Sequence, residues 1–263
     1  MRKVFIFTIF IVINFVIFTR SSIVLGASNI TPTPTIPPDP YLNKQQPVYQ
    51  WTRTVGEVDN GTGSETVQDI AFDSKNNIYI TGYFANTTDF DPSPAQDRKT
   101  SAGSNDMFLT KYDNNGNYLW TKTIGGIGFD YGAEIRIDSK DNIYVGGSYD
   151  KTVNFNPDGG GDILTTTGNG DPFIVKYDSN LNYQWVNTAT GPFNDPVADM
   201  AFDTNEDIYY TGYISSGVFN FNPRGIPMTY SAGGNHDIAF AKYNKDGTVL
   251  WGKGLGVGGD PTF

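Results

Sequence analysis

The stretch Lys111-Tyr-Asp-Asn-Asn-Gly-Asn-Tyr-Leu-Trp120 decides the fold, because it occurs three times. The second copy is Lys176-Tyr-Asp-Ser-Asn-Leu-Asn-Tyr-Gln-Trp185, and the third is Lys242-Tyr-Asn-Lys-Asp-Gly-Thr-Val-Leu-Trp251. A shorter copy, Tyr49-Gln-Trp51, precedes them, so that the four tryptophans are 69, 65 and 66 residues apart. In each long copy two strand-like runs flank a polar turn, which predicts a β-hairpin. Repetition at a nearly fixed pitch indicates a repeat architecture.

Each unit of about 65 residues contains four strand-like segments. In the first unit they span Val67–Phe72, Asn77–Phe84, Met107–Tyr112 and Tyr118–Ile124. A loop of about 20 residues separates the second segment from the third. No stretch shows a sustained 3.6-residue period, so we predict no helix.

The turn of the repeated hairpin needs a residue with positive φ, which glycine adopts at little cost. Gly116 and Gly247 provide it in the first and third copies. Leu181 replaces the glycine in the second copy. We therefore expect Asn180 or Asn182 to take the strained position there, because asparagine tolerates the left-handed region better than leucine.

Four strands per unit, repeated at this pitch, predict an all-β fold of the β-propeller type. Each blade is then a four-stranded antiparallel sheet that packs face to face on its neighbours, with its tryptophan between blades. We place about three blades, at residues 66–125, 132–190 and 197–256 of a repeat region 49–263. An orphan outer strand is expected at 49–56.

Three motifs of the first unit resemble the SBBP repeat, the "seven-bladed β-propeller" repeat of secreted bacterial proteins. They are Ala71-Phe-Asp-Ser-Lys-Asn-Asn-Ile-Tyr-Ile-Thr-Gly82, Gly103-Ser-Asn-Asp-Met-Phe-Leu-Thr-Lys-Tyr-Asp113 and Gly116-Asn-Tyr-Leu-Trp120. The resemblance recurs in all three units and implies the propeller fold. It implies no shared activity, because such repeats occur in many surface and extracellular proteins.

The number of blades is below the four to eight that closed propellers contain. Residues 49–56 look like the closing strand of a blade whose inner strands are missing, so we expect the sequence to be part of a longer protein. If it is complete, exposed blade faces and strand edges should drive self-assembly into a ring.

Composition excludes several classes of site. The chain has no cysteine and one histidine, which excludes disulfides, thiolate nucleophiles and multi-histidine metal centres. The formal charge is -10, and it becomes -13 without residues 1–27, which carry three basic residues and no acidic one. Such a body repels nucleic acid and anionic membranes.

The N-terminus predicts export. Arg2 and Lys3 precede an apolar run from Val4 to Phe18, and small residues follow near Ala27. This order is typical of a signal peptide over residues 1–27, and an uncleaved anchor is the alternative. Residues 28–48 contain Thr31-Pro-Thr-Pro-Thr-Ile-Pro-Pro-Asp-Pro40, which predicts an extended linker. We expect a secreted or cell-surface protein without membrane insertion after cleavage.

Three equivalent acidic residues, Asp69, Glu134 and Asp199, lie on the first strand of each unit, which lines the central channel of a propeller. Carboxylates repeated around an axis are a candidate cation site, with calcium as the preferred ion for oxygen ligands. The alternative is that each caps backbone donors or faces water. We expect no other cofactor.

Two further candidates have structural alternatives. The segments 89–92, 154–157 and 220–223 alternate oxygen-bearing side chains with phenylalanine, and we interpret them mainly as turns fixed by burial of the ring. A catalytic triad would need His236, which has no counterpart in the other units, and we interpret it as an exposed loop residue.

The sequence favours a binding or scaffolding module that recognises a protein or glycan through loops on one face, at Ser93–Ser101, Asp158–Thr167 and Arg224–Ser231. An extracellular polysaccharide hydrolase or lyase that uses carboxylates is one alternative, although no catalytic motif is present. A structural spacer or adhesin segment is the other.

Overall fold

The computed structural model describes residues 51–54, 56–57, 64–193, 195–233 and 236–256. The predicted signal peptide (1–27) and linker (28–48) lie outside this part of the chain. The described residues form strands and no helix, and hence no helix with the length and hydropathy of a membrane span.

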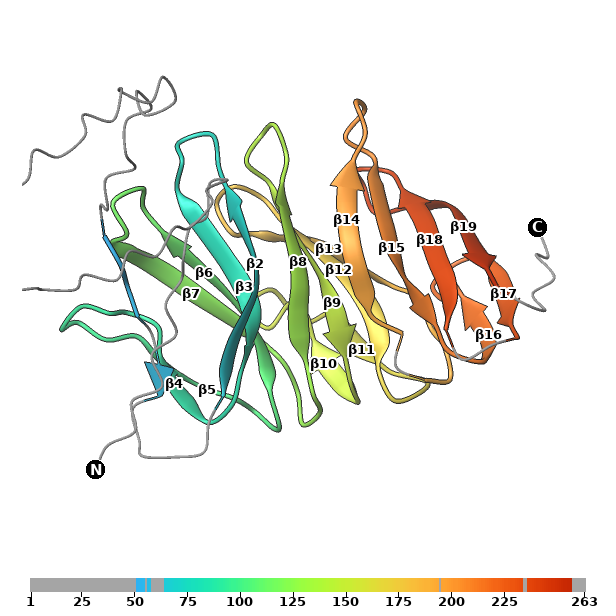
Figure 1. Ribbon diagram of the computed structural model, residues 1–263, viewed down its shortest axis with the longest axis horizontal. Helices are drawn as coiled ribbons and strands as arrows, with labels where there is room; N and C mark the ends of the chain where they lie inside the picture. Colours follow the sequence, from blue (N-terminus) through green and yellow to red (C-terminus); the bar gives the residue numbers. More distant parts are fainter. Residues whose placement is uncertain (1–50, 55, 58–63, 194, 234–235, 257–263) are drawn as a thin grey trace, which may run out of the picture.

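Three four-stranded antiparallel sheets confirm the predicted all-β fold (Figure 1). Blade 1 has the order β2-β3-β6-β7, with strands Glu65–Phe72, Ile78–Phe84, Asp106–Tyr112 and Tyr118–Ile124. Blade 2 has the order β8-β9-β12-β13, with strands Tyr131–Ile137, Ile143–Tyr149, Asp171–Tyr177 and Tyr183–Thr188. Blade 3 has the order β14-β15-β18-β19, with strands Val197–Phe202, Ile208–Ile214, Asp237–Tyr243 and Val249–Leu255.

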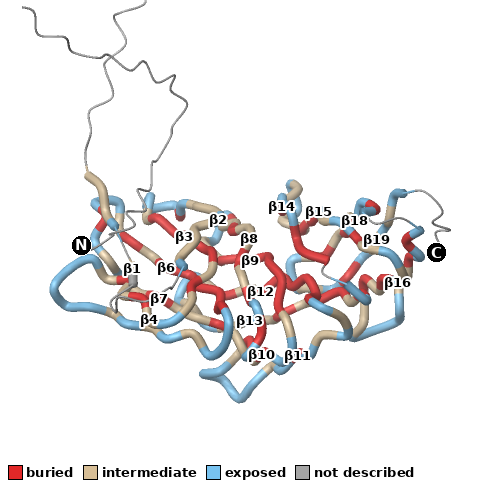
Figure 2. Tube along the Cα trace, turned by 60° about the horizontal axis from the view of Figure 1, so that its bottom comes forward, coloured by how far each residue is buried: buried red, intermediate tan, exposed pale blue. Residues whose placement is uncertain are grey.

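The blades stack side by side in an open arc with the first strand of each, β2, β8 and β14, adjacent to that of the next. Side chains on one face of blade 1, including Tyr79 and Leu109, share a buried cluster with Ile143 and Phe173 of blade 2. Tyr144 of blade 2 joins a second cluster with the strands of blade 3. Buried residues therefore concentrate in the sheets and exposed residues in the loops (Figure 2).

Trp120 and Trp185 pack between blades, as predicted, and each lies against the hairpin turn of the next unit. Trp51 lies against the equivalent turn of blade 1. A Cβ added to Gly247 would lie 2.8 Å from Cδ2 of Trp185, and one added to Gly116 would lie 2.8 Å from Cε3 of Trp51. These glycines have φ of 85° and 76°, as the turn requires. Glycine thus serves both the turn and the close approach of the ring.

The expectation for the second hairpin is wrong, because Leu181 itself adopts a φ of 68°. The Asp178 carboxylate fixes the backbone there by accepting from the amides of Asn180 and Asn182, both at 2.9 Å. The leucine side chain is partly buried in the same cluster as Trp120. Turn geometry set by Asp178 and packing at the tryptophan seat therefore outweigh the strain.

The long loop predicted between the second and third strands contains a hairpin in each unit. These accessory hairpins are β4–β5, β10–β11 and β16–β17, with strands Thr87–Asp89, Arg98–Thr100, Thr152–Asn154, Ile163–Thr165, Gly217–Asn220 and Thr229–Ala232. Strands of three or four residues are too short to show the alternation that sequence patterns detect. The repeat unit is therefore a blade with an accessory hairpin.

The orphan strand expected at 49–56 is also corrected. Of its described residues only Gly56 lies in a strand, the two-residue β1 (Gly56–Glu57), which pairs with β4 of the first accessory hairpin. Trp51 lies over blade 1 at the seat of a preceding tryptophan. The described part of this segment therefore pairs with the accessory hairpin of blade 1.

Candidate functional site

Asp69, Glu134 and Asp199 meet around one guanidinium, that of Arg136. Nη1 of Arg136 lies 2.7 Å from Oδ2 of Asp69. Its Nη2 lies 2.7 Å from Oε2 of Glu134 and 2.7 Å from Oδ1 of Asp199. Because these carboxylates belong to three different blades, Arg136 ties the inner strands of all three together.

A β-bulge precedes each of these carboxylates. The register of the first strand against the second shifts between Val67 and Asp69, between Gly132 and Glu134, and between Val197 and Asp199. Such a bulge bends the strand and redirects the side chains that follow it. The repeated local geometry therefore presents one carboxylate per blade at the inner edge of the arc.

The carboxylates also bind backbone amides. Oδ1 of Asp69 accepts from the amide of Ile70 at 2.8 Å, and its Oδ2 accepts from the amide of Ile135 in the next blade at 3.0 Å. Arg136 in turn donates from Nε to the carbonyl of Met200 at 2.7 Å. The node, defined here as Asp69, Glu134, Asp199 and Arg136, thus links neighbouring blades by both charge and backbone hydrogen bonds.

Charge is unevenly distributed in the node. Burial, followed by the neighbouring Asp69 carboxylate, raises the pKa of Glu134 to about 7, although Arg136 opposes the shift. Burial lowers the pKa of Arg136, but the charges of Glu134 and Asp69 outweigh it and leave this pKa above its usual value. Near neutral pH the Arg136 guanidinium therefore stays charged beside a Glu134 carboxyl that is partly protonated.

Sequence reasoning brought the three carboxylates together but missed their partner. The positions equivalent to Arg136 in the other two units are Ala71 and Ala201. An arginine at a position where the other units have alanine could have indicated this partner. In the described part of the chain, no group of three acidic or histidine side chains is arranged to hold a metal ion. Calcium binding by this column stays a prediction, and the cation that the structure places there is Arg136.

The other repeated polar residues hold turns. Oδ1 of Asp89 accepts from the amides of Asp91 and Asp97, and Oδ1 of Asn154 accepts from Asn156 and Asp162. Each therefore closes the tip of its accessory hairpin. The phenylalanines of these segments are buried as predicted, with 0–1% exposure for Phe90, Phe155 and Phe221.

Two buried aspartates, Asp130 and Asp195, lie just before the first strands of blades 2 and 3. Burial raises the pKa of Asp130 to about 7 and that of Asp195 to about 6. Backbone amides partly compensate: Asp130 accepts from Gly126 and Asp150, and Asp195 accepts from Ser215. These carboxylates receive amide donors from loops of the fold, which assigns them a structural role.

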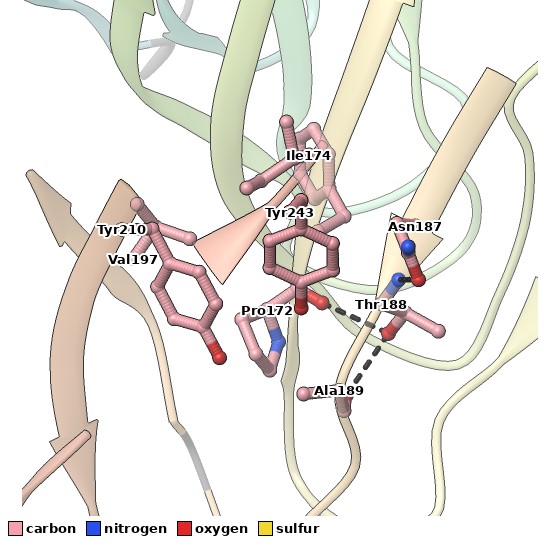
Figure 3. Close-up of a pocket in the computed structure, with 9 residues that line it drawn as sticks. Pro172, Ile174, Asn187, Thr188, Ala189, Val197, Tyr210 and Tyr243 are labelled. Atoms are coloured by element: carbon pink, nitrogen blue, oxygen red, sulfur yellow. Dashed lines mark hydrogen bonds between the residues drawn. The ribbon is translucent and has the colours of Figure 1, made fainter. Parts of the chain in front are cut away.

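His236, the sole histidine, is exposed and stacks on Tyr213 with the ring centroids 5.1 Å apart. A pocket between blades 2 and 3 (Figure 3) is lined mainly by apolar and aromatic side chains, among them Ile174, Val197, Tyr210 and Tyr243. Thr188 donates to the carbonyl of Pro172 at its rim. The gap has no volume open to a water-sized molecule, so it is part of the blade packing.

The accessory hairpin tips differ between units on a constant frame. Each tip spans seven residues, at 91–97, 156–162 and 222–228. Their central parts are Ser93-Pro-Ala-Gln96, Asp158-Gly-Gly-Gly161 and Arg224-Gly-Ile226, which are mostly exposed, with Ile226 at 83%. Neutral, acidic and basic-apolar chemistry therefore occupies equivalent places in three neighbouring units.

Comparison with known proteins supports the repeat assignment. Residues 50–90 match a family described as the SBBP β-propeller repeat, which confirms the resemblance. An uncharacterized WD repeat-containing protein of Acanthamoeba polyphaga mimivirus is 29% identical over 234 residues, 76% of this chain and 16% of that protein. The regulatory protein FlaEY of Caulobacter vibrioides is 26% identical over 128 residues, 46% of this chain and 13% of that protein. The chain spans a small part of the relatives it matches.

Proposed function

We propose that this chain, which carries the SBBP β-propeller repeat, is an exported binding or scaffolding module that recognises a protein or glycan through its accessory hairpin tips. The observation that carries the proposal is the contrast between frame and tips. The repeated polar residues bind backbone amides, Arg136 or turn residues of the frame, whereas the tips at 93–96, 158–161 and 224–226 vary in charge and are exposed. Variable loops on a rigid scaffold are a common way to build a binding surface.

The frame gives the tips fixed positions relative to one another. Arg224 of the third tip pairs with Asp162 at the base of the second, with 3.1 Å between Nη2 and Oδ1. Lys122 of blade 1 pairs with Asp158 in the second tip. The second tip is therefore linked by charged contacts to the third tip and to strand β7 of blade 1, and a ligand that spans the second and third tips would meet a preorganised surface.

A tip replacement tests this role. The variant carries Ser-Gly-Gly-Gly at 93–96 and 158–161 and Ser-Gly-Gly at 224–226, and wild type and variant are compared on a glycan array and a panel of extracellular proteins. Saturable binding by the wild type that the variant loses, with unchanged circular dichroism, supports the proposal. Binding that survives in the variant, or polysaccharide turnover that depends on one Asp or Glu, argues against it.

Export is tested separately. The sequence order Arg2-Lys3, apolar run, small residues predicts removal of the first 26 or 27 residues by signal peptidase. Mass spectrometry of protein recovered from outside the cytoplasm of a bacterial host should find an N-terminus at Ala27 or Ser28. Recovery of the intact N-terminus in the membrane fraction would instead support an anchor.

A further inference from the structure

Three aromatic side chains meet where blade 1 packs on blade 2. The ring centroid of Phe129 lies 5.2 Å from that of Tyr83 and 5.5 Å from that of Tyr131. The two tyrosine centroids are 6.3 Å apart, and the three interplanar angles are 55°, 64° and 75°. We call Tyr83, Phe129 and Tyr131 the aromatic cluster. It lies at the end of β3 from which the chain enters the first accessory hairpin.

The repeat does not require two of these rings. The other units have no aromatic residue at the positions of Phe129 and Tyr131; they have Ser64 and Thr66 in the first unit and Asn194 and Pro196 in the third. Phe129 is 41% exposed, whereas the repeated phenylalanines of the accessory hairpins are buried. Rings that blade packing does not need, and that stay partly open to solvent, are candidates for contact with a ligand.

Backbone hydrogen bonds hold Phe129 in place. The amide of Asp130 donates to the carbonyl of Asn105 at 2.9 Å, and the amide of Asn105 donates to the carbonyl of Gly128 at 3.4 Å. Oδ2 of Asp130 accepts from the amide of Gly126 at 2.7 Å, which closes the loop that carries the ring. The cluster is therefore positioned before a ligand arrives, and binding does not have to order it.

Polar side chains lie next to the segment that carries Phe129. Ser104 is exposed and directly precedes Asn105, the residue that pairs with Phe129 through a β-bridge. Asp150 lies beside Gly128, because a Cβ added to this glycine would be 2.8 Å from the Cβ of Asp150. The side chain of Asp150 is 20% exposed. A hydroxyl and a carboxylate are therefore available close to the aromatic cluster.

This combination fits a sugar ring. A pyranose has a face of C–H groups, which packs on aromatic rings, and a periphery of hydroxyls, which need hydrogen-bond partners. The inclined rings of the cluster suit the C–H face, and the oxygens of Ser104 and Asp150 suit the hydroxyls. The formal charge of the chain is -10, and -13 without residues 1–27, which disfavours an anionic polymer. A neutral polysaccharide therefore matches the site better than an acidic one.

We propose that the aromatic cluster, with Ser104 and Asp150 beside it, binds a sugar residue of a neutral polysaccharide. The site is distinct from the accessory hairpin tips and goes beyond the function proposed for them. Phe129 has the most exposed ring of the three and stacks on the sugar, while contact with Tyr83 and Tyr131 fixes the tilt of this ring.

Affinity electrophoresis of the full chain tests the site. Native gels contain hydroxyethyl cellulose, galactomannan or dextran as the neutral polymer, or alginate as the acidic one. At least one neutral polymer should retard the wild-type protein, and alginate should not. Phe129→Ala should weaken this binding about tenfold or more, whereas Phe129→Tyr, which keeps a ring, should change it by less than about threefold.

Phe193→Ala is the matched control, because Phe193 is 44% exposed in the loop before blade 3 and lies outside the cluster. It should leave the retardation unchanged. A wild-type protein that no neutral polymer retards would overturn the proposal, and so would equal retardation by alginate or equal losses in Phe129→Ala and Phe193→Ala. Binding that the tip replacement abolishes and Phe129→Ala retains would also overturn it, because the sugar would then belong to the hairpin tips.

Discussion

At the residue scale, the glycine of the repeated hairpin has two roles: it adopts the positive φ of the turn, and it leaves room for the tryptophan ring of the preceding unit. Gly247 and Leu181 occupy the same place in two hairpins, and both have positive φ. Glycine at this position could be predicted to carry the turn. That leucine could do the same could not be predicted, because its support comes from Asp178 amide contacts and from partial burial beside Trp120.

Gly247→Ala should destabilise the protein through two effects. The substitution places a side chain at a φ of 85°, which costs about 1–3 kcal/mol, and its Cβ would lie 2.8 Å from the Trp185 ring. Gly160→Ala is the matched control, since Gly160 has a φ of 96° and no atom within 4 Å of its added Cβ. Chemical denaturation should show the larger loss for Gly247→Ala, and equal losses would contradict the role of the tryptophan seat.

Stability should fall as pH rises from about 4 to about 7. Burial raises the pKa of Asp130 to about 7 and of Asp195 to about 6, whereas an aspartate in an unfolded chain titrates near 4. In this window the folded state retains protons that the unfolded state has released, so a rise in pH favours unfolding. Asp73, whose pKa is lowered in the fold, acts below this window and does not offset the effect.

Calorimetry at pH 5 and pH 7.5 measures this dependence. We expect the higher melting temperature at pH 5, and a smaller difference between the two conditions in Asp130→Asn. A melting temperature that rises with pH, or an unchanged difference in the variant, would show that these buried carboxylates do not set the pH dependence.

At the element scale, the blade strands were predictable and the accessory hairpins were not. Each of the four strands of a blade has 6–8 residues and is rich in the β-branched and aromatic residues that favour strands, and the order of the strands follows from the repeat. The accessory strands, such as Thr152–Asn154, have three or four residues and owe their pairing to Phe155 burial and to the Asn154 side chain. A comparison of the three units identifies the inner carboxylates, because an acidic residue recurs in each unit. The same comparison misses Arg136, because this arginine occurs in one unit only.

Asn154 should be replaceable by aspartate but not by alanine. Its Oδ1 accepts from the amides of Asn156 and Asp162 at 3.0 and 3.1 Å, and Asp89 makes the same contacts in blade 1. Asn154→Ala leaves two amides without this acceptor, which should cost about 1–2 kcal/mol. Asn154→Asp should change the free energy of unfolding by less than about 0.5 kcal/mol. Equal destabilisation by both variants would mean that the side chain does not hold the hairpin.

At the scale of the whole molecule, Arg136 converts three stacked blades into one connected arc. Arg136→Ala should lower the free energy of unfolding by about 1–2 kcal/mol, less than for a fully buried pair because about a third of the side chain is exposed. Arg98→Ala, at an exposed position of β5, is the control and should have little effect. A loss no greater than that of the control would show that the node contributes nothing to stability.

The melting temperature of the wild-type protein in excess EDTA and in millimolar calcium shows most directly whether the inner carboxylates hold Arg136 or a metal ion. If the carboxylates of Asp69, Glu134 and Asp199 serve to hold Arg136, the two melting temperatures should agree. A clear rise in calcium that disappears in Asp69→Asn would contradict the claim, because it would show that the inner carboxylates bind a metal ion in addition to the arginine.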